Sequence, residues 1–155
     1  MAQNQNYAEK AREAIVSGQR ITEEKKLAQY EPETLLSSLV DQSDGIVPQI
    51  LQRLQVEPER VSREVASLVD RAPKLQISSE AIVSQGLRKA LTDAETEAAG
   101  FGDEYISTEH LLLGILRQER SPAESLLRGH GVDREAVMTA LTEIRGSQRD
   151  HATTR

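Results

Sequence analysis

The sequence of 155 residues contains no cysteine, no tryptophan and a single phenylalanine. The absence of cysteine excludes disulfides, thiol nucleophiles and cysteine-based zinc sites. Aromatic residues make up 3% of the chain, too few for the stacking platforms that bind single-stranded nucleic acids. The net charge is −6 with both signs interspersed, whereas domains that bind duplexes usually carry a basic surplus. The composition therefore argues against a nucleic-acid partner.

Long apolar runs are missing as well. No stretch approaches the roughly 18 apolar residues that a membrane-spanning helix needs, and the polar segment 1–6 lacks the charged-then-apolar pattern of a secretion signal. We therefore expect a cytoplasmic location and no membrane partner. Hydrophobic residues make up 37% of the chain, which is enough for the core of one domain or of two small domains fused tightly.

The chain does contain an internal repeat. Segments 30–36 and 106–112 resemble each other and place Glu33 and Glu109, which are 76 positions apart, at the same point of the pattern. This offset holds without a gap from Arg12 to Val65. The identical pairs include Arg12/Arg88, Ala14/Ala90, Leu35/Leu111, Leu36/Leu112, Gln42/Gln118, Leu51/Leu127, Val56/Val132 and Val61/Val137. We infer that the sequence arose by duplication.

Each repeat is predicted to contain four helices, because apolar residues recur at helical spacing and strand alternation is absent. Pro32 and Pro58 suit the first position of a helix, Ser107 suits an N-cap, and Gly131 suits a left-handed C-cap. We therefore predict an all-α fold of about eight helices, in which two four-helix repeats pack around a pseudo-twofold axis. The expected boundaries are repeat one at about 7–71, a linker at 72–77, repeat two at about 78–145, and a flexible tail at 150–155.

Two segments resemble a known family. The repeated Pro/Thr-Glu-x-Leu-Leu helices and the segment Asp103–Leu113 resemble the double repeat of Clp N-terminal domains, and Ile144–Arg149 resembles the point where ClpB-type disaggregases leave this domain for a linker. The likeness covers about residues 7–149. It implies a non-catalytic domain, monomeric by itself, on a hexameric ATPase ring. Such a domain engages unfolded or aggregated polypeptides and adaptor proteins and delivers them to the pore.

The resemblance also implies where a partner binds. The expected polypeptide- or adaptor-binding residues border a groove near the second helix of each repeat: Phe101, Asp103, Tyr105, Ile106, Thr108, Glu109, His110 and Glu33. Each has a plainer interpretation, because carboxylates are favoured in the first turn of a helix and Phe101 could be a buried staple. The chain departs from its relatives at Asp93, Glu97 and His110, where some of them place leucines, so the groove is expected to be more polar.

The sequence is also compatible with other functions. A ClpC-like adaptor or phosphoarginine docking domain would use Glu33 and Glu109, but Pro32 replaces the threonine that Thr108 provides in repeat two. A free-standing Clp-N interaction protein and a purely structural scaffold are further alternatives. No phosphate-binding loop is present, and the histidines lack helical i, i+4 spacing, so we expect no enzymatic activity, no metal and no cofactor.

Overall fold

The computed structural model describes residues 6–153, with side chains described up to residue 146, and this part of the chain forms eight helices. The helices of the first repeat are α1 (Glu9–Glu24), α2 (Pro32–Val40), α3 (Ile46–Arg53) and α4 (Pro58–Asp70). Those of the second are α5 (Gln85–Phe101), α6 (Thr108–Leu116), α7 (Pro122–Gly129) and α8 (Arg134–Thr153). Each helix of the second repeat begins 76 positions after its counterpart, so the all-α double repeat is confirmed.

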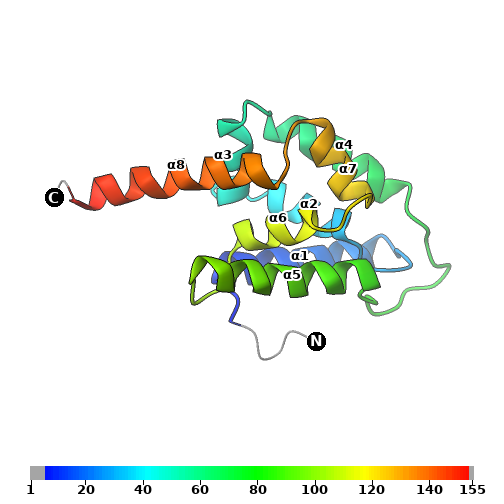
Figure 1. Ribbon diagram of the computed structural model, residues 1–155. Helices are drawn as coiled ribbons and strands as arrows, with labels where there is room; N and C mark the ends of the chain where they lie inside the picture. The colour runs from blue at the N-terminus through cyan, green and yellow to red at the C-terminus, as the bar shows by residue number, and fades with distance from the viewer. Residues whose placement is uncertain (1–5, 154–155) are drawn as a thin grey trace.

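Helices α2 and α6 lie at the centre of the molecule (Figure 1). Every residue of α6 is buried, and in α2 only Ser37 is not. Helices α1 and α5 lie on one side of this pair, and α3, α4 and α7 lie on the other, while α8 projects away from the body toward the C-terminus. The central pair is therefore the core around which both repeats assemble.

The two repeats exchange equivalent contacts, as a pseudo-twofold axis requires. Ala8 N–H donates to the Ile106 carbonyl at 2.9 Å, and Ser84 N–H donates to the Tyr30 carbonyl at 3.0 Å. These two bonds map onto each other, because Ser84 follows Ala8, and Ile106 follows Tyr30, by 76 positions. At the level of helices, α1 contacts α6 as α5 contacts α2, and α4 contacts α7 as α8 contacts α3. Each repeat is thus completed by the other.

The helix boundaries follow local signals, more strongly in repeat two. The hydroxyl of Ser84 accepts a hydrogen bond from Leu87 N–H and so caps α5, whereas Ala8 at the start of α1 provides no side-chain cap. Gly102 and Gly131 adopt the left-handed conformation, with φ of 72° and 79°, where a helix ends. The predictions for Pro32, Pro58, Ser107 and Gly131 are all confirmed by these boundaries.

The linker between the repeats and the C-terminal tail have other bounds in the structure than those predicted from the sequence. Residues 71–84 carry no helix, and the predicted linker 72–77 lies inside this stretch. Helix α8 continues past Gly146 to Thr153, through most of the segment that was predicted to be a tail. Residues 154 and 155 of that tail lie outside the described residues. The apolar pattern ends at Ile144, but a helix needs no buried face to continue into solvent.

Candidate functional site

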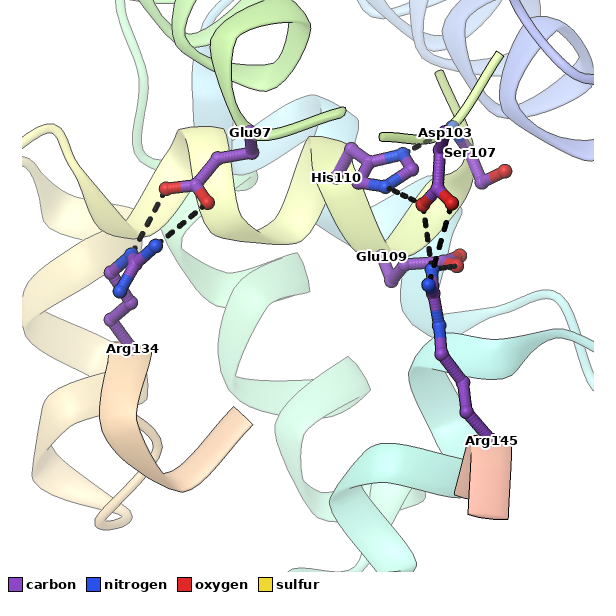
Figure 2. A network of polar contacts seen from close by, with 7 residues as sticks. All are labelled: Glu97, Asp103, Ser107, Glu109, His110, Arg134 and Arg145. Atoms are coloured by element: carbon purple, nitrogen blue, oxygen red, sulfur yellow. Dashed lines mark hydrogen bonds and ion pairs between the residues drawn. The ribbon is translucent and has the colours of Figure 1, made fainter. Parts of the chain in front are cut away.

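A cluster of polar side chains joins the turn between α5 and α6 to helix α8 (Figure 2). Gly102 ends α5 and Ser107 precedes α6, and the short turn between them places Asp103 close to the first residues of α6. Arg145 reaches this turn from α8. Its Nη2 lies 2.8 Å from Asp103 Oδ2 and 3.2 Å from Glu109 Oε2. We call Phe101, Asp103, Glu109, His110 and Arg145 the turn cluster.

His110 is the fully buried member of the turn cluster. Its Nδ1 accepts a hydrogen bond from Ser107 N–H at 2.8 Å, so the ring proton lies on Nε2, which donates to Asp103 Oδ2 at 2.9 Å. The His110 ring also contacts Phe101, with 5.4 Å between the ring centroids, and the guanidinium carbon of Arg145 lies 4.7 Å from the Phe101 centroid. His110 thus fixes the conformation of the turn.

The charges of the turn cluster balance locally. Burial by itself raises the pKa of Asp103, but the hydrogen bonds from Arg145 and His110 outweigh it and hold that pKa below its usual value. The bond to Asp103 in turn raises the pKa of Arg145. Asp103 is therefore ionised at neutral pH, and the arrangement is an ion pair suited to holding a helix, with no group poised to exchange a proton.

The structure brings together some of the predicted site residues and separates others. Phe101, Asp103, Glu109 and His110 meet in the turn cluster. Tyr105 is 51% exposed in the same turn, and it is the predicted residue most open to a partner. Ile106 and Thr108 are buried beneath the turn, and Glu33 lies in the other repeat.

A second ion-pair network occupies the positions at which a more polar groove was expected. Glu97 of α5 is 3% exposed and accepts from Arg134 Nη2 at 2.9 Å and from Arg117 Nε at 2.8 Å. The hydrogen bond from Arg134 is the main reason that the pKa of Glu97 lies below its usual value. Asp93 accepts from Gln118 Nε2 at 2.7 Å. The polar substitutions at Asp93, Glu97 and His110 are therefore matched by partners within the chain.

Comparisons with known proteins agree with this architecture. Residues 6–130 match the family model described as the Clp repeat (R) N-terminal domain. The chain belongs to the Clp repeat N-terminal domain family. Chaperone protein ClpB of Bdellovibrio bacteriovorus is 40% identical over 141 residues, which are 90% of this chain and 16% of that protein. ClpB 2 of Synechocystis is 33% identical over 92% of this chain. The chain thus spans about a sixth of the length of these curated relatives.

Solved structures show the same fold at lower identity. The Hsp104 N-terminal domain from Candida albicans has a TM-score of 0.80 and 19% identity, with 92% of this chain and 93% of that chain covered. A ClpV N-domain in complex with a VipB peptide has a TM-score of 0.70 and 18% identity, with 84% and 81% covered. These likenesses establish the Clp N-domain fold.

The first Clp repeat lacks a counterpart of the turn cluster. Glu33 is equivalent to Glu109, but the position equivalent to Arg145 is Val69, which is buried. Glu33 is 8% exposed, and its Oε1 has no hydrogen-bond partner among the described residues. Burial therefore raises the pKa of Glu33 above its usual value. The glutamate at this position thus forms an ion pair in repeat two, and among the described residues it forms none in repeat one.

Repeat one instead has a groove of about 520 Å³ between α1 and α2. We call it the α1–α2 groove; its lining includes Arg12, Val16, Arg20, Ser38 and Gln42, and the acidic residues Glu9, Glu13 and Asp41. Two polar atoms there, Ser38 Oγ and Gln42 Oε1, are buried without hydrogen-bond partners in the described part of the chain. Nothing in the sequence patterns indicated this groove.

The charged partners that the sequence analysis missed are three arginines. Arg117 and Arg134 hold Glu97, and Arg145 holds Asp103 and Glu109, yet none of the three was assigned a role. A buried or half-buried carboxylate needs a partner. Asp93 and Glu97, which the sequence analysis had noted as departures from the family pattern, could therefore have indicated that nearby arginines pair with them. In the part of the chain that the structure describes, no group of three potential ligands could hold a metal ion, and no helix is long and apolar enough to cross a membrane.

Proposed function

We propose that this chain is the substrate- and adaptor-binding N-terminal domain of a ClpB-like protein disaggregase. In this proposal the domain has no catalytic role; it engages unfolded or aggregated polypeptides and passes them to a hexameric ATPase ring in the cytoplasm. The observation that supports it most directly is the 40% identity to a chaperone ClpB over 90% of this chain. The ClpV N-domain solved with a VipB peptide adds an example of this fold binding a polypeptide.

The proposed contact surface for unfolded chains is the turn between α5 and α6. Tyr105 is its exposed aromatic residue, and half-buried Asp103 lies beside it. Tyrosine offers a large apolar face with a polar tip, which suits loose contacts with many sequences. The buried members Ile106, Thr108 and His110 would support the turn and would not touch a partner unless the turn opened.

A titration of the ¹⁵N-labelled domain with casein, an unfolded model protein, tests the proposal. We expect chemical-shift changes to gather at residues 101–112, with an affinity in the micromolar range or weaker, about 8 kcal/mol at most. Replacing Tyr105 with alanine should weaken binding by about fivefold to tenfold, because it removes the exposed aromatic anchor. Several domains on one ring would recover strength through effective concentration.

The matched control is Ile77→Ala, which removes an exposed apolar side chain of the linker that is 75% accessible. This variant should bind casein as the parent does. Equal loss in both variants would mean that binding follows general surface hydrophobicity, and an absence of shifts with casein would contradict the proposed function.

Phosphoarginine docking is the second candidate, and one observation favours it. Glu33 has a buried, unpartnered carboxylate oxygen in the first turn of α2, where a guanidinium could bind. Its equivalent Glu109 is already engaged by Arg145 at 3.2 Å, so at most one repeat could accept such a ligand. A phosphoarginine peptide that shifts the α2 resonances around Glu33 while casein shifts nothing would favour this function over the first.

A further inference from the structure

The α1–α2 groove is larger than its counterpart in repeat two, a pocket of about 300 Å³ along α5. Gly114 lies in α6 at the position where Ser38 lies in α2. A Cβ atom at Gly114 would collide with the Ala90 carbonyl oxygen and lie 2.9 Å from Ala94 N, so α6 packs against the α5 backbone. Accordingly, α5 and α6 approach within 8 Å over a longer stretch than α1 and α2 do. Repeat one has Ser38 at this place, and Ser38 lines the groove.

The floor of the groove carries unsatisfied polar atoms. Ser38 is 5% exposed, and its Oγ has no hydrogen-bond partner among the described residues; the same is true of Gln42 Oε1. A buried polar atom without a partner costs about 1–3 kcal/mol, so such atoms are normally satisfied. Gln42 itself donates from Nε2 to the Lys10 carbonyl at 2.9 Å, so its unsatisfied atom is the acceptor oxygen. Gln42 Oε1 needs a donor, and the N–H groups of a polypeptide backbone would provide one.

The wall of the groove carries a regular row of side chains. Arg12, Val16 and Arg20 follow one another at intervals of four along α1, so they lie on one face, about 6 Å apart along the helix axis. Val16 is 49% exposed. The Arg12 side chain donates only to the Tyr7 carbonyl, at 3.3 Å, and neither arginine has an ion-pair partner among the described side chains. Two guanidinium groups thus flank an exposed apolar residue.

An extended polypeptide has a matching repeat. Alternate side chains of an extended strand point to one side and are about 6.6 Å apart. A segment with an acidic residue at positions i and i+4 and an apolar residue at i+2 would therefore align with Arg12, Val16 and Arg20, with carboxylate–guanidinium pairs at both ends. Glu9, Glu13 and Asp41 also line the groove, so a uniformly acidic segment would be repelled and the two carboxylates of the segment must lie next to Arg12 and Arg20.

We propose that the α1–α2 groove of repeat one binds extended polypeptide segments of the pattern acidic–x–apolar–x–acidic. This site is separate from the surface around Tyr105, and it holds whether or not that surface binds unfolded chains. It would give the domain a preference for sequence in addition to a general affinity for unfolded polypeptide. Repeat two has a smaller pocket at the equivalent place, but α5 carries Thr92 and Thr96 where α1 carries Val16 and Arg20.

The test uses the whole domain and the peptide acetyl-SGESLTEGS-amide, which carries the pattern. We expect shift changes at Arg12, Val16, Ser38 and Gln42, and a dissociation constant that rises about tenfold in Arg20→Gln. The control variant Arg88→Gln, which changes the residue of repeat two equivalent to Arg12, should bind as the parent does. The peptide acetyl-SGEESLTGS-amide has the same composition with adjacent acids and should bind at least fivefold more weakly.

Several results would overturn the proposal. Equal binding of the two peptides would show that the groove does not recognise the spacing of the acidic residues. Unchanged binding in Arg20→Gln would show that the arginines of α1 do not bind the peptide. Shifts confined to residues 101–112, or no binding at all, would place no ligand in the groove. Tyr105→Ala should retain peptide binding, so failure of the surface around Tyr105 and failure of this groove give different results.

Discussion

At the scale of single residues, the same chemical group has opposite consequences in the two repeats. Glu109 is held by Arg145, whereas Glu33 is buried and one of its carboxylate oxygens has no hydrogen-bond partner among the described residues. An unpaired buried carboxylate opposes folding when it is ionised, while a paired one favours it. The pair of glutamates therefore provides an internal comparison in one protein.

We expect Glu33→Gln to raise the free energy of unfolding at pH 7 by about 1 kcal/mol, because it removes a buried charge. The native pKa of Glu33 is raised, so the native state binds a proton that the unfolded state has lost, and stability falls as pH rises from about 4.3 through the native pKa. The gain should therefore vanish near pH 4. Urea denaturation at both pH values measures it. Glu109→Gln should destabilise the domain, and the same sign for both variants would contradict this account.

Glu97→Gln should lower the free energy of unfolding at pH 7 by about 1–2 kcal/mol, because three hydrogen bonds from two arginines to a buried carboxylate are weakened. The native pKa of Glu97 is depressed, so its contribution is present above about pH 4.3 and is lost as pH falls through the native pKa. The difference between variant and parent should shrink in acid. Glu119→Gln, at an exposed residue outside the helices, should show no such difference in the same denaturation series.

At the scale of helices, close packing of α5 on α6 depends on Gly114. Gly114→Ala places a methyl group against the Ala90 carbonyl, so we expect a loss of about 1–3 kcal/mol from overpacking. The matched control is Gly100→Ala in α5, where no atom lies within 4 Å of the added Cβ and the better helix propensity of alanine should stabilise by about 0.5–1 kcal/mol. Thermal unfolding of both variants measures these changes in stability. If Gly114→Ala is as stable as the parent, α5 can move away from α6 without cost.

Helix positions were predictable from the sequence because their signals are local. Pro32, Pro58 and Ser107 act within a few residues of themselves, and the 76-residue offset carried each start from one repeat to the other. The turn cluster was only half predictable. Asp103, Glu109 and His110 belong to one continuous motif. Arg145 lies 42 residues beyond Asp103, and helical periodicity does not predict contacts between residues so far apart in the sequence. The end of α8 was not predicted, because the apolar pattern that indicates a helix stops at Ile144.

At the scale of the whole molecule, each repeat provides surface that the other needs. Helices α2 and α6 are buried almost completely, and part of that burial is against each other. The segment before α1 bonds to the segment before α6, and the segment before α5 bonds to the segment before α2. A separated repeat would expose an apolar helix and lose backbone hydrogen bonds at two places, so the two repeats should fold as one unit.

We therefore expect the intact domain to unfold in a single transition, with equal calorimetric and van't Hoff enthalpies. Fragments 1–77 and 78–155, separated at the exposed Ile77, should each have little helix by circular dichroism, because α2 or α6 would lie open to water. Mixing the fragments should restore the helical signal, since the linker itself provides only a few of the contacts between repeats. A cooperative unfolding transition in either fragment alone would show that the repeats are independent folding units. The reciprocal hydrogen bonds between the repeats would then not be needed for either repeat to fold.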